Sequence, residues 1–350
     1  FTIKITKTTA SKLKEISWNN LPFGKYFTDH MLEADYINGA WTKAEIKPFQ
    51  SISLSPSVSA LHYGQAIFEG IKAFRGKDNS AYIFRPHDNH KRFNISARRL
   101  EMATVPEELF IEGMRQLVAL DQQWIPDKPD HSLYIRPFMF GMDETLGVHP
   151  STSYKFIIIL SPTGPYYAKP MRIYVEEKYT RAAPGGVGYA KAAGNYASAL
   201  LATSEAQKKG YDQVLWTDAF THKTVQEIGT MNVFFIIGNK AITPGLHSET
   251  ILAGVTRDTA ITLLKEMGLS VEERDIQIDE VVAAYKNKQL REVFGTGTAA
   301  TISKIRELRY KDQVMEFDVD SWTLCVEVKR RLDAIRSFQA PDPHGWMFKV

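Results

Sequence analysis

One lysine, Lys191, lies in a glycine-rich stretch, PGGVGYAKAAGNY (184–196). Glycines there allow close approach of the backbone to a ligand, or dihedral angles that other residues avoid. The sequence neighbours of Lys191 are small or apolar and include no carboxylate. Such surroundings can desolvate an amine and favour the neutral, nucleophilic form that reacts with a carbonyl group. A structural or solvent-exposed lysine is the alternative that this stretch alone leaves open.

The glycine spacing excludes two common phosphate-binding motifs. GGVGYAK lacks the four residues that separate Gly from Gly-Lys in a Walker A loop, and it lacks the GxGxxG turn of a dinucleotide fold. Two other segments could bind an anion. Gly254, Val255 and Thr256 are expected at a helix N-terminus, whose free N–H groups favour phosphate, and FGTGTAAT (294–301) offers further donors. An ordinary capped helix and an ordinary turn are the alternatives.

A glutamate also stands out, because Glu227 in VQEIGTMN (225–232) leads into a Gly-Thr turn between two expected strands. Its alternative interpretation is a solvated carboxylate at a strand end. His87 and His90 could suggest a metal, but their three-residue spacing at a helix start, without further ligands, argues against one. We therefore expect no metal site.

The elements that must position these residues alternate between strands and helices, which predicts a mixed α/β (α+β) fold with mixed sheets. In the first half we expect strands at 82–86, 133–140 and 155–160, and helices at 87–103, capped by Asp88, and at 106–125. In the second half we expect strands within 212–244, with a tight turn at Gly238–Asn239, a helix ending at Gly268, a helix at 278–288, and a strand at 291–297 followed by a long terminal helix.

The chain is long enough for two domains, and its best linker is SPTGPYYAKP (161–170), with three prolines and one glycine. This predicts a small N-terminal α/β domain at 1–160 and a larger C-terminal domain at 171–350.

Composition excludes several classes of partner. The net charge is +3 without blocks of like charge, which gives no footprint for nucleic acid. The longest apolar runs are far shorter than the roughly 20 residues that span a membrane, and the N-terminal segment lacks a signal-peptide core. The single cysteine, Cys325, is expected to be buried on the terminal helix. We therefore expect a cytoplasmic protein without membrane or nucleic-acid partners.

Six motifs follow one another along the chain: FEGIKAFRG (68–76), LYIRPFMFGMDETLGV (133–148), GGVGYAKAAGNYA (185–197), VQEIGTMN (225–232), LAGVTRD (252–258) and FGTGTAA (294–300). In this order and spacing they resemble the branched-chain amino acid aminotransferases, within the class IV (fold type IV) pyridoxal-phosphate enzymes. The resemblance extends from about residue 20 to the C-terminus. It implies pyridoxal 5′-phosphate as cofactor, an active site between two domains, and a homodimer in which one subunit's small domain helps cover the other's site.

The resemblance also implies cofactor roles for individual residues. Lys191 matches the lysine that bonds covalently to the cofactor, and Tyr196 the tyrosine that hydrogen-bonds its phenolic oxygen. Glu227 matches the carboxylate that faces the pyridine nitrogen, and Arg92 the arginine that binds the phosphate. The other phosphate-side contacts match Thr230, Val255, Thr256 and Thr296.

Substrate contacts follow in the same way. Thr298 and Ala299 match the turn whose backbone holds the substrate carboxylate. The positions that match the lining of the substrate pocket are Tyr63, Phe68, Tyr134, Arg136, Val148 and Tyr166. Phe68, Tyr134 and Tyr166, with Val148, would form an apolar wall for leucine, isoleucine or valine. Arg136, two residues after Tyr134 on a strand, would share its face and bind the distal carboxylate of glutamate.

The implied reaction is reversible amino transfer between these amino acids and 2-oxoglutarate, with ping-pong kinetics through pyridoxamine phosphate. The nearest alternatives are two other class IV enzymes, a D-amino acid aminotransferase and an aminodeoxychorismate lyase, whose chains lack the long segment before Leu61. A non-catalytic protein on this fold would lack Lys191 or Glu227. Ala300 and Ser303 replace the Cys-x-x-Cys of some mammalian members, so thiol regulation of that kind is not expected.

Overall fold

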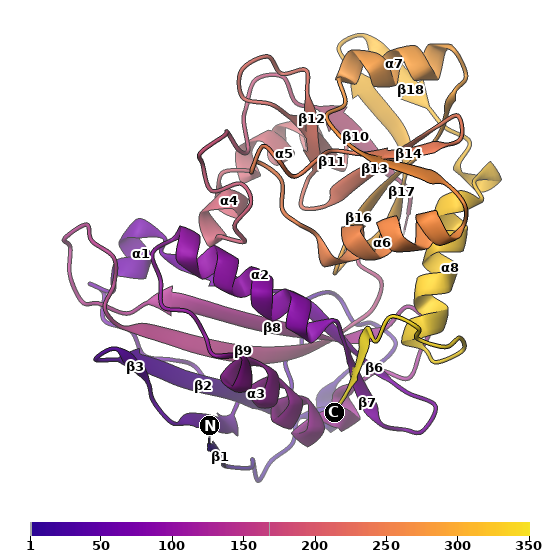
Figure 1. Ribbon diagram of the computed structural model, residues 1–350. Coiled ribbons are helices and arrows are strands. Elements are labelled where there is room, and N and C mark those ends of the chain that lie inside the picture. The colour runs from indigo at the N-terminus through magenta and orange to yellow at the C-terminus, as the bar shows by residue number, and fades with distance from the viewer. Residues whose placement is uncertain (1, 168) are drawn as a thin grey trace. The chain divides into compact units, whose positions relative to one another are not determined.

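The computed structural model describes residues 2–167 and 169–350, which form two compact units (Figure 1). The first unit extends to Tyr166 and includes Ala190–Gly194 and Ala334–Val350, and the second comprises the remaining described residues. The break after Tyr166 falls inside the predicted linker 161–170, of which Ala168 lies outside the described residues, as does Phe1 of the predicted N-terminal domain. The predicted 171–350 domain differs from the second unit, because two of its segments pack with the first.

A mixed sheet forms the centre of the first unit. Its strand order is β1-β4-β2-β9-β8-β6-β7-β19, with β3 on β2 and β5 on β8. The bounds are β1 (Ile3–Ile5), β2 (His30–Ile37), β3 (Ala40–Trp41), β4 (Ala44–Pro48), β5 (Ala66–Phe68), β6 (Ile71–Arg75), β7 (Ala81–Phe84), β8 (Ser132–Gly141), β9 (Tyr154–Thr163) and β19 (Met347–Lys349). Residues 161–163, predicted as linker, belong to β9, because Thr163 pairs with Ser132 of β8.

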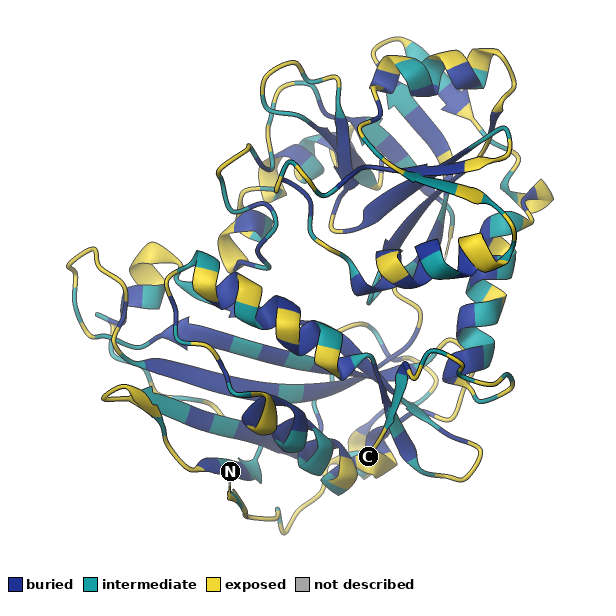
Figure 2. Ribbon diagram, in the orientation of Figure 1, coloured by how far each residue is buried: buried dark blue, intermediate teal, exposed yellow. Residues whose placement is uncertain are grey.

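Two helices cover one face of this sheet (Figure 1): α2 (Pro86–Arg99) and α3 (Glu107–Leu120). A buried stripe runs along each of them (Figure 2), and the rings of Phe93, Phe110 and Phe156 pack together beneath. The predicted cap Asp88 is wrong: the residue before α2 is Arg85, in the left-handed region at φ 48°. Asp88 instead lies in the first turn, where it accepts from Arg85 Nε at 2.8 Å. The remaining helical turns of this part are α1 (Ser59–Tyr63) and two 3₁₀ turns, Leu13–Glu15 and Gln122–Trp124.

The second unit has its own mixed sheet, in the order β12-β11-β10-β17-β16-β13-β14-β15, with β18 on β17. The bounds are β10 (Met171–Val175), β11 (Gln213–Thr217), β12 (Val225–Ile228), β13 (Asn232–Ile237), β14 (Lys240–Thr243), β15 (Ser270–Glu273), β16 (Leu290–Gly297), β17 (Thr301–Tyr310) and β18 (Gln313–Glu316). Two mixed sheets with flanking helices confirm the predicted fold class, and Gly238–Asn239 forms the predicted turn between β13 and β14.

The helices of the second half of the chain are α4 (Ala193–Ala197), α5 (Leu200–Lys208), α6 (Val255–Glu266), α7 (Ile278–Lys286) and α8 (Leu324–Arg336), with a 3₁₀ turn at Val319–Ser321. The prediction that the strand at 291–297 leads directly into the terminal helix is wrong, because β17 and β18 intervene. Cys325 is buried on α8, as predicted. Among the described residues, no helix is both long and apolar enough to cross a membrane.

Candidate active site

The backbone of Lys191 is fixed by hydrogen bonds within the first unit. Its N–H donates to Ser96 Oγ at 2.8 Å, and its carbonyl accepts from the Phe68 N–H at 3.1 Å. The next residue, Ala192, forms an isolated bridge with Ile67 of β5. The Lys191 side chain is half-buried and its Nζ lies 4.9 Å from the centre of the Phe68 ring. The structure therefore places this lysine against an aromatic ring and not in open solvent.

Arg92 lies one turn before Ser96 on the same buried face of α2. It forms a bidentate ion pair with Glu69, with Nε–Oε1 and Nη2–Oε2 distances of 2.8 Å. Glu69 is fully buried and also accepts from the Gly70 N–H at 3.2 Å. The pair fixes the plane of the guanidinium, as binding of a planar or tetrahedral anion requires. Glu69 was not predicted, although it directly follows Phe68 in FEGIK.

Three of the predicted pocket residues meet beside Lys191. Arg136 Cζ lies 4.5 Å from the centre of the Phe68 ring and 5.2 Å from that of Tyr134. Arg136 Nη2 donates to the Tyr134 hydroxyl at 3.0 Å, which confirms that both side chains share one face of β8. The Nε of Arg136 is buried and has no partner among the described residues. A cation with an unsatisfied donor thus lies against two aromatic rings.

A further aromatic residue, Phe23, extends this group and was not predicted. Its ring packs edge-on against Tyr134 at 4.8 Å and against Tyr166 at 5.0 Å. Gly70 is required beneath Tyr134, because a Cβ at that position would lie 2.1 Å from the tyrosine oxygen.

The other two predicted pocket residues, Tyr63 and Val148, are exposed and lie outside this aromatic group. Tyr63 is 45% exposed at the end of α1 and its hydroxyl donates to the Leu146 carbonyl, while Val148 is 83% exposed in a loop after β8.

In the second unit, Glu227 is buried on β12 with 4% exposure, so the alternative of a solvated carboxylate is wrong. Its Oε1 accepts from Asn232 Nδ2 and from the Leu252 N–H, each at 3.0 Å. Its Oε2 pairs with Arg181 Nη2 at 2.9 Å. Neither Asn232 nor Arg181 was predicted, although Asn232 ends the VQEIGTMN motif.

The predicted phosphate-side residues of the second unit lie on helix and strand ends. The helix α6 begins at Val255, directly after Gly254, which confirms the predicted N-terminus, and Thr256 is buried in its first turn. A Cβ on Gly254 would lie 2.0 Å from Asn232 Oδ1, so only glycine fits there. Thr230 is exposed in the turn between β12 and β13.

Thr296, on β16, has a fully buried hydroxyl with no partner among the described residues. An unpaired buried hydroxyl is unfavourable unless a ligand completes its hydrogen bonds. These residues fit an anionic group such as a phosphate.

The remaining predicted residues lie on a short helix and in a hairpin turn. Tyr196 is half-buried on the short helix α4, where Asn195 Nδ2 donates to the Val187 carbonyl of the glycine loop at 2.8 Å. Thr298 and Ala299 form the hairpin turn between β16 and β17, whose last pair is Gly297 with Thr301.

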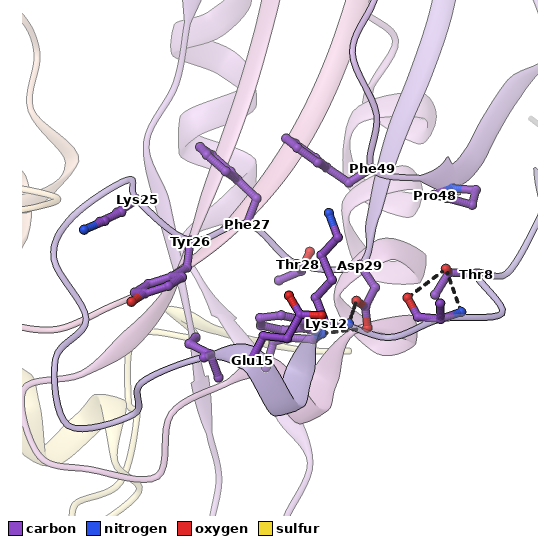
Figure 3. A pocket seen from close by; sticks show the side chains of 13 residues that line it. Thr8, Lys12, Glu15, Lys25, Tyr26, Phe27, Thr28, Asp29, Pro48 and Phe49 are labelled. Carbon is purple, nitrogen blue, oxygen red and sulfur yellow. Dashed lines mark hydrogen bonds between the residues drawn. The ribbon is translucent and has the colours of Figure 1, made fainter.

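A cavity of about 300 Å³ lies elsewhere in the first unit (Figure 3). Its walls include Lys12, Lys25 and Asp29, but none of the predicted site residues. The Asp29 carboxylate accepts from Ser11 Oγ at 2.5 Å, the Lys12 N–H at 2.8 Å and Trp124 Nε1 at 3.1 Å. The Asp29 carboxylate is therefore satisfied by hydrogen bonds within the protein.

Comparison with known proteins agrees with this chemistry. The family model for class IV amino-transferases matches residues 66–308. A probable branched-chain-amino-acid aminotransferase of Staphylococcus aureus (strain MRSA252) is 50% identical over 338 residues, covering 95% of this chain and 94% of that protein. Branched-chain-amino-acid transaminase 1 of Bacillus subtilis (strain 168) is 46% identical over 95% of both chains.

Solved structures show the same similarity. The branched-chain amino acid aminotransferase of Escherichia coli superposes with a TM-score of 0.75 and 27% identity, covering 90% of this chain and 98% of that one. A second branched-chain amino acid aminotransferase, complexed with N-(5′-phosphopyridoxyl)-L-glutamate, has a TM-score of 0.70 and 27% identity, covering 90% and 97%. The chain therefore belongs to the class IV aminotransferases and, within them, to the branched-chain-amino-acid aminotransferase family. This confirms the resemblance carried by the six motifs.

Proposed function

We propose that this protein reversibly transfers the amino group of L-leucine, L-isoleucine or L-valine to 2-oxoglutarate, with pyridoxal 5′-phosphate as cofactor. The observation that carries the proposal is Arg136, whose buried, unpartnered Nε lies against the rings of Phe68 and Tyr134 beside Lys191. Aromatic surface suits an aliphatic side chain, and a guanidinium suits the distal carboxylate of glutamate. The names of the relatives above support the same substrates.

The residues that we expect to hold the cofactor are those that match the family's cofactor contacts. They are Arg92, Lys191, Tyr196, Glu227, Thr230, Val255, Thr256 and Thr296. When bound, pyridoxal phosphate supplies an electron sink for negative charge at the substrate Cα. Arg92, held in place by Glu69, would bind the phosphate, while the N–H groups at the start of α6 and the Thr296 hydroxyl would donate to its oxygens.

The other expected site residues would bind the cofactor or substrate and hold or move protons. Lys191 Nζ would bond to the cofactor and, once a substrate amine displaces it, take the proton from the substrate Cα. The Glu227 carboxylate would hold a proton on the ring nitrogen, because a negative neighbour favours the charged form of that nitrogen. Tyr196 would hydrogen-bond the phenolic oxygen, and the backbone of Thr298 and Ala299 would bind the substrate carboxylate.

Substrate choice would depend on the aromatic group around Arg136. Phe68, Tyr134 and Tyr166 offer an apolar wall for a branched side chain. Arg136 would bind glutamate in the same place, and the pocket would be completed by Tyr63 and Val148.

We also propose that the protein acts as a cytoplasmic homodimer. Leu61, Leu146 and Val148 are 62%, 66% and 83% exposed, and large apolar side chains with this exposure are suited to contact with a second copy. Light scattering on the purified protein tests the dimer, and a monomer at micromolar concentration would contradict it.

Initial rates on a panel of L- and D-amino acids with 2-oxoglutarate test the reaction. We expect the highest kcat/KM for L-leucine, L-isoleucine and L-valine, and an absorption band near the visible–ultraviolet boundary that shifts when L-leucine is added. Lys191→Ala should abolish transamination without changing the circular dichroism spectrum. A preference for D-amino acids would favour the D-amino acid aminotransferase, and a protein that takes up no cofactor would refute the proposal.

A further inference from the structure

Arg181 joins three segments of the second unit although it lies outside the six motifs. Its Nη2 pairs with Glu227 Oε2 at 2.9 Å, donates to the Thr250 carbonyl and lies 3.5 Å from the Gly188 carbonyl of the glycine loop. The side chain is only 8% exposed. Gly188 permits this arrangement, because a Cβ there would lie 2.7 Å from the Thr250 carbonyl oxygen.

The contacts of Arg181 complete the set of donors around the Glu227 carboxylate. Asn232 and Leu252 hold Oε1, and Arg181 holds Oε2, so donors fix both oxygens of the carboxylate. A carboxylate with 4% exposure and no cation would leave an uncompensated buried charge. The guanidinium thus fixes the orientation of Glu227 and compensates its charge.

The ion pair with Glu227 stabilises the fold but leaves one donor of this arginine unsatisfied. Its Nε is buried without a partner among the described residues, which is unfavourable by itself. A buried group without a partner calls for an explanation, and a role in catalysis is one of the known explanations. Orientation of Glu227 would be such a role.

We propose that Arg181 is a positioning residue for amino transfer, acting through Glu227 on the ring nitrogen of the cofactor. The proposal rests on the proposed function, namely that Glu227 faces the cofactor ring. It separates two roles that a buried arginine can have. A structural arginine stabilises the fold whatever stands at position 227, whereas a positioning arginine matters for the reaction only while the Glu227 carboxylate is present.

A double-mutant cycle distinguishes these roles. The proteins are wild type, Arg181→Gln, Glu227→Gln and the double variant, each saturated with pyridoxal phosphate. We expect Arg181→Gln to lower kcat by about 10–100-fold with KM for the amino acid changed by less than about threefold, as for residues that orient a reacting group. In the Glu227→Gln background the same change should alter kcat by less than about threefold. Arg181→Lys, which keeps the charge, should restore part of kcat.

Two further readouts do not depend on turnover. The pH titration of the cofactor absorption band should shift in Arg181→Gln and should not shift further in the double variant. The thermal midpoint of each protein, with and without cofactor, shows whether it is folded. Arg172→Gln is the matched control, because Arg172 pairs with Glu307 in the same unit with an Nε–Oε2 distance of 2.8 Å. It should change the midpoint but neither kcat nor the band titration.

Equal losses of kcat in both backgrounds, or an unchanged band titration in Arg181→Gln, would overturn the proposal. If Arg181→Gln does not fold, the same cycle with Arg181→Lys decides: a loss of kcat confined to the Glu227 background supports the proposal, and no such coupling overturns it. A wild type that accepts no branched-chain amino acid would contradict the proposed function alone, because the cycle can be run with any amino donor that it does accept.

Discussion

We expect Arg136 to let one pocket accept an acidic side chain as well as an aliphatic one, by binding the carboxylate of the acidic one. Its buried Nε is unsatisfied, and a carboxylate oxygen would satisfy it. We expect Arg136→Ala to raise KM for glutamate and 2-oxoglutarate by about 10–100-fold, the loss typical of a charge-assisted hydrogen bond, and KM for leucine by less than about threefold. Steady-state kinetics with both substrate pairs measure the difference.

Two controls accompany this prediction. Arg136→Lys keeps the charge but not the planar fork, so its KM for glutamate should lie between those of wild type and Arg136→Ala. Arg115→Ala removes a surface arginine that pairs with Glu112 and should leave both KM values unchanged. An equal rise for leucine and glutamate in Arg136→Ala would show that Arg136 supports the pocket without choosing the substrate.

At the scale of single residues, the sequence indicates candidates for the chemistry but not the residues that contact them. Lys191 and Glu227 could be proposed from the residue types and order of their motifs, and their roles stay predictions. Glu69 and Arg181 could not, because each acts through a contact with a residue distant in the sequence, Arg92 and Glu227 respectively. A charged residue gives no local sign of its eventual partner.

At the scale of elements, the turn that leads into β12 is organised by Asp218. Its carboxylate accepts from the backbone N–H groups of Thr221 and Thr224 at 2.8 Å and of Lys223 at 2.9 Å. Burial raises the pKa of Asp218, but the donors of Thr221, Thr224 and Lys223 outweigh burial and hold the pKa well below its ordinary value. Because the folded pKa is lower than the unfolded one, this stabilisation is present above the unfolded pKa and is lost as pH falls.

We therefore expect Asp218→Asn to lower the thermal midpoint at pH 7 by about 3–6 °C and to lower it less as the pH falls below about 4. Differential scanning fluorimetry across this pH range measures both effects. Asp320→Asn, at an exposed aspartate, is the control and should change the midpoint little. A difference between variant and wild type that is the same at every pH would contradict the assignment.

The start of α8 depends on a carboxylate from a strand. Glu292 of β16 is buried and accepts from the N–H groups of Thr323 at 2.9 Å and of Leu324 and Cys325 at 2.8 Å. These are N–H groups that a helix cannot satisfy itself, and a negative charge there also favours the helix dipole. The arrangement replaces a side-chain cap from the helix's own sequence.

We expect Glu292→Ala to destabilise the protein by about 2–4 kcal/mol, because three donors, of which that of Cys325 is buried, lose a charged acceptor. Urea unfolding measures the loss, and labelling of Cys325, the one cysteine in the sequence, reports opening of α8. Burial, with a smaller contribution from Glu292, raises the pKa of this thiol, so wild type should label slowly. Glu327→Ala, which removes only surface ion pairs on α8, should cost less than about 1 kcal/mol. Equal effects would refute the capping role.

The elements themselves were predicted where their apolar pattern was continuous, as in β9 and β13. The strand β17 was missed, because TISKIRELRY contains charged residues that obscure alternation. Its position between β10 and β16 explains how those charges are accommodated, since Glu307 pairs with Arg172 of β10. A partner on another strand, such as Arg172, cannot be identified from the sequence of β17 alone.

At the scale of the whole molecule, length and the proline-rich segment predicted two parts, and the break after Tyr166 lies in that segment. The return of residues 190–194 and 334–350 to the first unit could not be predicted. Five residues that lie beside β5 and a three-residue strand that pairs with β7 carry too little pattern to be assigned from sequence.

This interleaving determines the order in which the protein can be completed during translation. The strand β7 remains an unpaired edge until residues 347–349 have left the ribosome, and the place of Lys191 beside Ile67 and Phe68 is filled only after part of the second unit has been made. An unpaired edge is a template for pairing with another chain. The edge of β7 in the nascent N-terminal half is therefore open to misassociation until residues 347–349 have been synthesised and released.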